Sequence, residues 1–158
     1  MRNKLLMGLI VVALLGVAGW TQLPQTASAQ DVQAVVPPQE VVADFYDWYL
    51  EYVNAGRGDM AGMRNPLVDG AYRTCGYLTE AFVQEIDETL ASFDKGGFDP
   101  FLLAQDIPES VDLGETVMVS DEANVVIQMF WSGNPTPTER TVTVKQVDGQ
   151  WKIAGITF

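Results

Sequence analysis

The side chains in this sequence that are best suited to acid–base chemistry lie close together between residues 99 and 106. Asp99, Gln105 and Asp106 occupy a proline-containing segment that joins apolar stretches. Polar groups in such a segment must be solvated, hydrogen-bonded or functional, because burial without a partner is costly. If Asp106 faces a closed apolar pocket, its carboxyl group could act as a general base or acid. The alternative is loop architecture, in which the aspartates cap backbone amides.

Aromatic residues could complete a ligand-binding pocket beside this segment. Tyr46, Tyr49 and Trp131 present rings that suit an apolar or aromatic ligand, although aromatic residues at helical and strand spacings also dominate ordinary core packing. Arg73 could pair with Asp106 or with an anionic ligand, and the alternative is an exposed ion pair of little energetic value. The candidate ligand-binding residues are Tyr46, Tyr49, Tyr72, Arg73, Asp99, Gln105, Asp106 and Trp131.

Composition excludes most familiar catalytic and metal-binding classes. The chain has no histidine and a single cysteine, Cys75. Histidine-based catalytic triads and the usual zinc and copper sites are therefore excluded, and no Walker or dinucleotide-binding glycine motif occurs. We expect no metal and no cofactor. Cys75 is expected to be a small buried hydrophobic residue, with an intermolecular disulfide as the alternative.

The charge of the chain limits its partners. Its 158 residues include 9 basic and 21 acidic side chains. Nucleic acid is not an expected partner, because phosphate backbones are neutralised by Lys and Arg, and the basic residues here are few and scattered. The negative electrostatic potential of this acidic chain opposes docking on an anionic membrane and favours cationic ligands or basic protein surfaces. Solubility alone is the alternative explanation of this charge.

The N-terminal segment has the features of an export signal. Arg2 and Lys4 precede an apolar run over residues 5–20, and a small-residue cleavage box occupies residues 27–29. We expect residues 1–29 to be removed. No cysteine directly follows the cleavage box, so we predict a soluble periplasmic or extracellular protein without a lipid anchor.

Residues 30–38 are expected to form a flexible tether that leads into a single domain, residues 39–158. Apolar side chains recur at helical spacing between Glu40 and Ala55, with acidic residues on the remaining stripe, which predicts an amphipathic helix. A second amphipathic helix is predicted to begin near Thr79, whose hydroxyl can cap it, and to end at the Lys95-Gly96-Gly97 segment.

The hydrophobic period changes from helical to alternating after residue 112. Four strands are predicted, at residues 116–120, 125–131, 138–147 and 150–158. Short turns separate them, and Asp148-Gly149 is a strong two-residue hairpin signal. Helices first and an antiparallel sheet last, without βαβ alternation, indicate an α+β domain.

Three segments together carry a family resemblance: Phe-Tyr-Asp-Trp-Tyr-Leu at 45–50, the Asp-Pro-Phe to Asp-Ile-Pro stretch at 99–108, and Asp-Gly-Gln-Trp-Lys-Ile at 148–153. On these segments the chain resembles the bacterial domain-of-unknown-function family 3828, whose members are similar to exported proteins of the nuclear-transport-factor-2-like superfamily. The resemblance covers essentially the whole mature chain. It implies a cone in which N-terminal helices pack in a curved four-stranded antiparallel sheet, with an open end that often forms a pocket.

The family has no assigned activity, so the resemblance implies a fold more than a function. The leading hypothesis is a non-catalytic binding or interaction module with a small-molecule or peptide pocket walled by Tyr46, Tyr49, Trp131 and the 99–106 loop. Related superfamily enzymes use a pocket carboxylate with aromatic hydroxyls, so a lyase or isomerase with Asp106 as base and Tyr46 as hydroxyl donor is an alternative. A third hypothesis is an envelope protein-interaction module, which forms a homodimer through its sheet or binds a basic partner.

Overall fold

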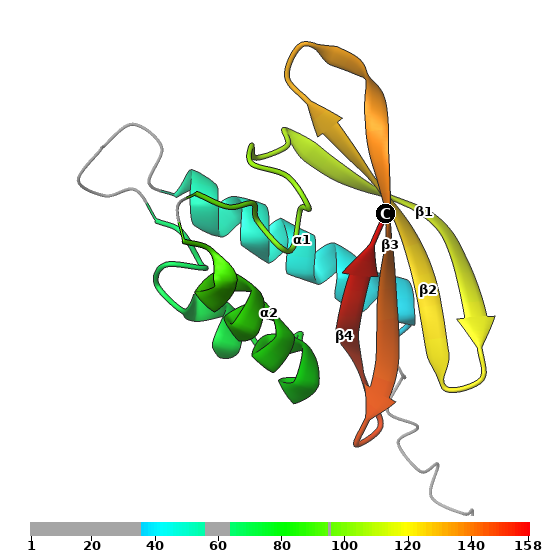
Figure 1. Cartoon of the computed structure of the whole chain (residues 1–158). Coiled ribbons are helices and arrows are strands. Elements are labelled where there is room, and N and C mark those ends of the chain that lie inside the picture. Colours follow the sequence, from blue (N-terminus) through cyan, green and yellow to red (C-terminus); the bar gives the residue numbers. More distant parts are fainter. Residues whose placement is uncertain (1–35, 56–63, 95) are drawn as a thin grey trace, which may run out of the picture. The chain divides into compact units, whose positions relative to one another are not determined.

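The structure is a computed structural model that describes residues 36–55, 64–94 and 96–158. Along the chain these residues form α1 (Pro38–Asn54), a short 3-10 helix η1 (Ala71–Arg73), α2 (Glu80–Ser92), and the strands β1 (Ser110–Val119), β2 (Glu122–Trp131), β3 (Asn134–Val147) and β4 (Gln150–Thr157) (Figure 1). Helices followed by one antiparallel sheet confirm the α+β class. The predicted signal and most of the predicted tether lie outside the described residues. Within the described ranges, no helix has both the length and the apolar character needed to cross a bilayer.

The sheet has the strand order β1-β2-β3-β4, and each neighbouring pair is antiparallel, so β1 and β4 are its edges. Alternation along β2 separates the two faces, since Val125, Ile127 and Met129 are fully buried whereas Val126 and Phe130 are only half-buried. We call the face that carries the three buried residues the inner face. α1 packs against β1, β2 and β4, and α2 packs against β4, so the core lies between the helices and the inner face.

β1 and β3 begin earlier than the sequence predicts. β1 starts at Ser110, which pairs with Phe130, and β3 starts at Asn134, which pairs with Trp131. Neither of these early segments has a clear hydrophobic alternation of its own. Both segments are strands because their backbones pair with β2, so their conformation depends on residues distant in the sequence.

α2 begins at the predicted cap and ends sooner than predicted. The hydroxyl of Thr79 accepts a hydrogen bond from the backbone N–H of Phe82 at 3.2 Å. The helix ends at Ser92, because Phe93 is extended and its ring lies against the backbone of Gly97. A Cβ atom at Gly97 would come within 2.3 Å of that ring. The glycine is therefore needed here for a close approach rather than for a helix stop.

Replacing Thr79 by alanine removes the cap of α2. We expect Thr79→Ala to lower the free energy of unfolding by about 1 kcal/mol, because the amide of Phe82 loses its acceptor. Thr79→Ser keeps the oxygen and should lose much less. Urea unfolding followed by circular dichroism measures both variants, and equal losses would contradict the capping role.

The two edges of the sheet lie in different environments. Outside β4, Leu78 forms a parallel bridge with Ile153. The N–H of Thr79 donates to the carbonyl of Ile153 at 2.9 Å, and the N–H of Ile153 donates to the carbonyl of Tyr77 at 2.8 Å. No described residue pairs with the outer side of β1. In the described part of the chain, the outer side of β1 is therefore open, whereas β4 is covered around Ile153.

Candidate functional site

The predicted polar loop folds into a tight turn centred on Asp99. Its carboxylate oxygen Oδ1 accepts the backbone N–H groups of Phe101 at 2.8 Å and Leu102 at 3.3 Å. The backbone N–H of Asp99 donates to the carbonyl of Ala104 at 2.7 Å, which closes the turn. Asp99 therefore has the architectural role that an aspartate can take in a turn.

Two tyrosines of α1 hold this turn from the inside. The hydroxyl of Tyr49 donates to Oδ2 of Asp99, and the hydroxyl of Tyr46 donates to the carbonyl oxygen of Phe101 at 2.8 Å. Residues three apart lie on the same face of a helix, so both phenols reach the same turn. Tyr49 is completely buried and Tyr46 nearly so. Side-chain hydrogen bonds thus tie α1 to a segment far along the chain.

Burial controls the ionisation of these groups. It raises the pKa of the Tyr46 and Tyr49 hydroxyls above the ordinary 10.0, and the nearby charge of Asp99 raises them further. Burial also raises the pKa of the Asp99 carboxyl above 3.8, although hydrogen bonds from Tyr49 and from two backbone amides oppose this rise. At neutral pH both phenols are therefore hydrogen-bond donors.

Phe101 fills the space beneath the turn. The centroid of its ring lies 5.2 Å from that of Phe45, 5.5 Å from Tyr49, 5.8 Å from Tyr72 and 6.1 Å from Phe82, each pair edge to face. Such pairs contribute about 0.5–1.5 kcal/mol beyond the burial of their area. The aromatic residues around the turn are therefore packed as core.

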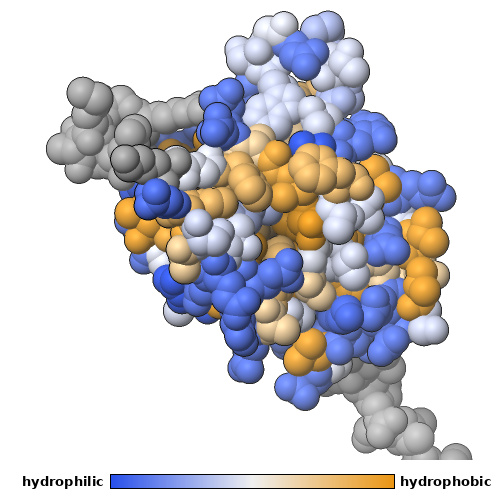
Figure 2. Space-filling model, in the orientation of Figure 1, coloured by the Kyte–Doolittle hydropathy of each residue, from blue (hydrophilic) through white to orange (hydrophobic). Residues whose placement is uncertain are grey.

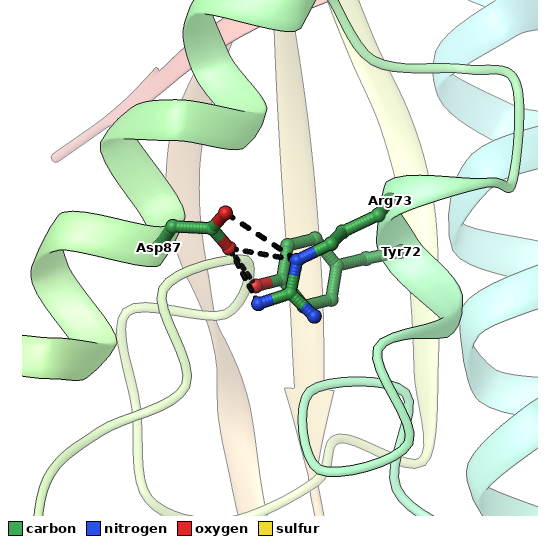
Figure 3. Close-up of polar contacts among 3 residues, drawn as sticks. All are labelled: Tyr72, Arg73 and Asp87. Atoms are coloured by element: carbon green, nitrogen blue, oxygen red, sulfur yellow. Dashed lines mark hydrogen bonds and ion pairs between the residues drawn. The ribbon is translucent and has the colours of Figure 1, made fainter.

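A second polar cluster joins η1 to α2 (Figure 3). The hydroxyl of Tyr72 donates to Oδ1 of Asp87, and Nη2 of Arg73 lies 2.8 Å from the same oxygen. Arg73 and Asp87 are 48% and 40% exposed, so their ion pair contributes little to stability. Burial, together with the hydrogen bond to Asp87, raises the pKa of Tyr72 to about 12. The same hydrogen bond, with those from Arg73, lowers the pKa of Asp87.

Among the described residues, the side chains of the other predicted site residues have no hydrogen bond to either cluster. Gln105 is exposed, and its side-chain amide donates to the carbonyl of Gly97 at 3.1 Å. Asp106 is exposed. Trp131 is half-buried, and its indole N–H donates to the hydroxyl of Thr138 at 3.0 Å across the β2–β3 hairpin. The structure thus gathers Tyr46, Tyr49, Tyr72 and Asp99 around Phe101, and the ion pair of Arg73 is with Asp87 rather than with Asp106.

Arg140 is a candidate that the sequence analysis does not select. It lies on the inner face of β3, opposite Ile127, and its positive charge opposes the rise in the Tyr46 pKa that burial causes. A signal was present in the pattern: Arg140, Val142 and Val144 share one face of the strand by alternation. A basic residue in register with buried valines is expected to point into the core.

Two predictions concern metal ions and the cysteine. Among the residues that the structure describes, no group of three or more His, Cys, Asp and Glu side chains lies close enough together to hold a metal ion. Cys75 is half-buried, its Sγ lies 3.2 Å from the carbonyl oxygen of Tyr72, and burial raises the pKa of its thiol. The thiol therefore packs largely as a small apolar group.

Comparison with known proteins supports the fold. No protein-family model and no curated protein matches the chain. The chain is similar to a chain of the type VI native effector-immunity complex Tae3-Tai3 from Ralstonia pickettii, with a TM-score of 0.58 and 23% identity over 76% of this chain and 93% of that chain. It is also similar to a chain of the selenomethionine form of the complex, with a TM-score of 0.55 and 22% identity over 77% of this chain and 95% of that chain. For a protein of unknown function from Bacteroides thetaiotaomicron, the TM-score is 0.48 and the identity is 24%, over 77% of this chain and 91% of that chain. At this identity, the likeness to the complex shows a known fold alone.

Proposed function

We propose that this is an exported, non-catalytic protein-binding module whose β1 edge receives an extended basic segment of a partner protein. The difference between the two sheet edges carries the proposal. β4 is joined by the segment around Leu78, whereas β1 has no partner on its outer side among the described residues. A free edge presents unpaired N–H and C=O groups that another chain can extend.

The end of β1 lacks the features that usually protect an edge. Val117, Met118 and Val119 are consecutive apolar residues, each about half exposed. This stretch contains no proline or lysine, which are residues that often protect an edge strand from pairing. Figure 2 shows apolar atoms at the margin of the molecule where Figure 1 places the end of β1. Side chains on alternate sides of such a strand can contact an added strand, so both backbone and apolar surface are available for binding.

Charge favours a basic partner over a second copy of this chain. β1 contains Asp112 and Glu115 and no Lys or Arg, and Asp121 follows it. Two copies of β1 paired with each other would bring like charges together, which destabilises a strand pair. A segment that alternates basic and apolar residues would instead match both features of this edge.

Two further observations support a binding role. The structural likeness is to a chain from a complex of two proteins, described as an effector-immunity complex. The polar groups around Asp99 hold backbone amides and tyrosine hydroxyls, and Asp106 is exposed, so no contact favours the lyase or isomerase alternative. The predicted small-molecule pocket at Tyr46, Tyr49 and Trp131 stays a prediction.

A labelled peptide that alternates valine with lysine tests the edge. We expect it to bind the wild-type domain, and a matched peptide with glutamate in place of lysine to bind at least about tenfold more weakly. Fluorescence anisotropy measures the affinities. Hydrogen exchange should show new protection of backbone amides within Ser110–Val119, because an added strand takes up their free hydrogen-bonding groups.

Matched surface variants locate the contact. The double variant Val117→Lys and Val119→Lys should weaken the lysine peptide about tenfold or more by repulsion and loss of apolar contact. Val147→Lys changes an exposed valine on β3, which lies two strands away from β1 in the sheet, and should bind like wild type. Equal binding by all three proteins, or protection outside β1, would show that the edge is not the site.

A further inference from the structure

Among the described residues, Arg140 is a charged side chain that is buried without a counter-charge. It lies on β3 opposite Ile127 of β2 and is 9% exposed. Its neighbour along the inner face, Val142, is fully buried. The ion pairs found in the described part of the chain belong to Arg73 and Lys145, and neither involves Arg140.

Much of the hydrogen-bonding capacity of Arg140 is unused. Nη1 donates to the carbonyl oxygen of Glu139 at 2.7 Å. Nε is buried and has no hydrogen-bond partner among the described residues. The guanidinium carbon lies 4.5 Å from the centroid of the Phe158 ring. A guanidinium has five N–H donors in a planar fork, so these contacts leave its Nε side without an acceptor.

A buried arginine in this position lowers the stability of the fold unless a counter-charge pairs with it. Burial of an ion without a counter-charge is unfavourable, and an apolar residue of similar size is often more stabilising there. Contact with an aromatic face offsets only part of such a penalty. Buried polar groups that stay unsatisfied in a native protein call for an explanation, and departures from good packing concentrate where a protein functions. The unmatched fork therefore points to an anion that the described residues do not supply.

We propose that Arg140 anchors a binding site for a small organic carboxylate with an apolar or aromatic body. The N–H groups of a guanidinium match the two oxygens of a carboxylate in a bidentate pair. Ile127, which pairs with Arg140 in the strand register, and Met129 make this face of the sheet apolar. The ring of Phe158, which the guanidinium contacts, is 86% exposed.

Thermal unfolding in the presence of benzoate tests this site, with benzamide as a neutral probe of matched shape. For the wild-type protein we expect benzoate to give a saturable rise in Tm of a few degrees and benzamide to give none, because only the anion pairs with the guanidinium. Arg140→Met should abolish the response. Without ligand, this variant should melt at or above the wild-type temperature, because the unpaired buried charge is gone.

Two further variants separate binding from folding. Arg140→Lys keeps the charge and loses the planar fork, so it should fold and respond to benzoate much less. Arg73→Met removes an exposed arginine that already has a counter-ion and should respond like wild type. Equal responses to benzoate and benzamide, a retained response in Arg140→Met, or a clearly lower Tm of that variant would overturn the site. Stabilisation by inorganic phosphate as strong as that by benzoate would overturn the assignment to a carboxylate. The proposed carboxylate site does not involve β1, so the outcome of these experiments does not test the proposal that a partner binds the β1 edge.

Discussion

Phe101→Ala should unfold at a much lower urea concentration than the wild-type protein. We expect a loss of about 3–5 kcal/mol in the free energy of unfolding, because truncation of a buried phenylalanine removes apolar contact and leaves a cavity. Phe101 is completely buried, and its ring meets rings from α1, η1 and α2. Small domains have only about 5–15 kcal/mol of total stability, so the variant should be marginally folded. Urea titrations followed by tryptophan fluorescence measure the change.

Phe98→Ala is the matched control for this prediction. Phe98 belongs to the same segment, is exposed, and has one ring partner, Phe93, at 5.3 Å between centroids. Its truncation should cost about 1 kcal/mol, the value of one aromatic pair. Phe101→Leu keeps much of the apolar volume and should fall between the two alanine variants. Similar losses for the two alanine variants would mean that the turn at Asp99 does not belong to the core.

Elements whose cause is local could be predicted from the sequence. α1 has apolar side chains at helical spacing along its length, and α2 begins with a threonine that can cap it, so both helices follow from their own residues. The final hairpin follows from Asp148-Gly149, where both residues have positive φ, as a tight two-residue turn requires. In each case the signal and its structural consequence lie within a few residues of each other.

The first half of β1 could not be predicted in this way. Asp112, Gly114 and Glu115 interrupt the alternation, and a register shift lies within the same stretch. This segment is extended because it pairs with β2, as in Leu113 with Ile127. The predicted cone is a similar case, because sheet curvature depends on how all the strands pair and twist.

The two aspartates of the predicted site show the same limit at the level of single side chains. Asp99 and Asp106 lie in one loop with similar neighbours in sequence, and either could cap a turn or face a pocket. Asp99 is the residue that contacts Tyr49, and Asp106 is exposed. Which of the two aspartates contacts the core depends on where α1 packs against the loop, and this cannot be read from the local sequence.

Asp99→Asn should become more stable relative to the wild-type protein as the pH rises from about 4 to 7. Burial raises the pKa of the Asp99 carboxyl in the folded protein above its ordinary value of 3.8. A group with a raised folded pKa contributes its full stability below the unfolded pKa and loses it as the pH rises through the folded pKa. Asparagine has no such titration, so its advantage should grow over this range. Urea unfolding of both proteins at several pH values measures the difference, and the other carboxyl groups cancel because both proteins share them.

Asp87→Asn is the control of opposite sign, because hydrogen bonds from Tyr72 and Arg73 lower the pKa of Asp87. The wild-type carboxylate contributes stability above the unfolded pKa, and this contribution is lost as the pH falls through the folded pKa. Asp87→Asn should therefore be less stable than wild type at neutral pH, with a difference that fades in acid. A fall in the relative stability of Asp99→Asn between pH 4 and 7 would mean that the donors around Asp99 outweigh its burial. The carboxylate would then be held as an anion by its turn, and the core around Phe101 would be more polar than its packing indicates.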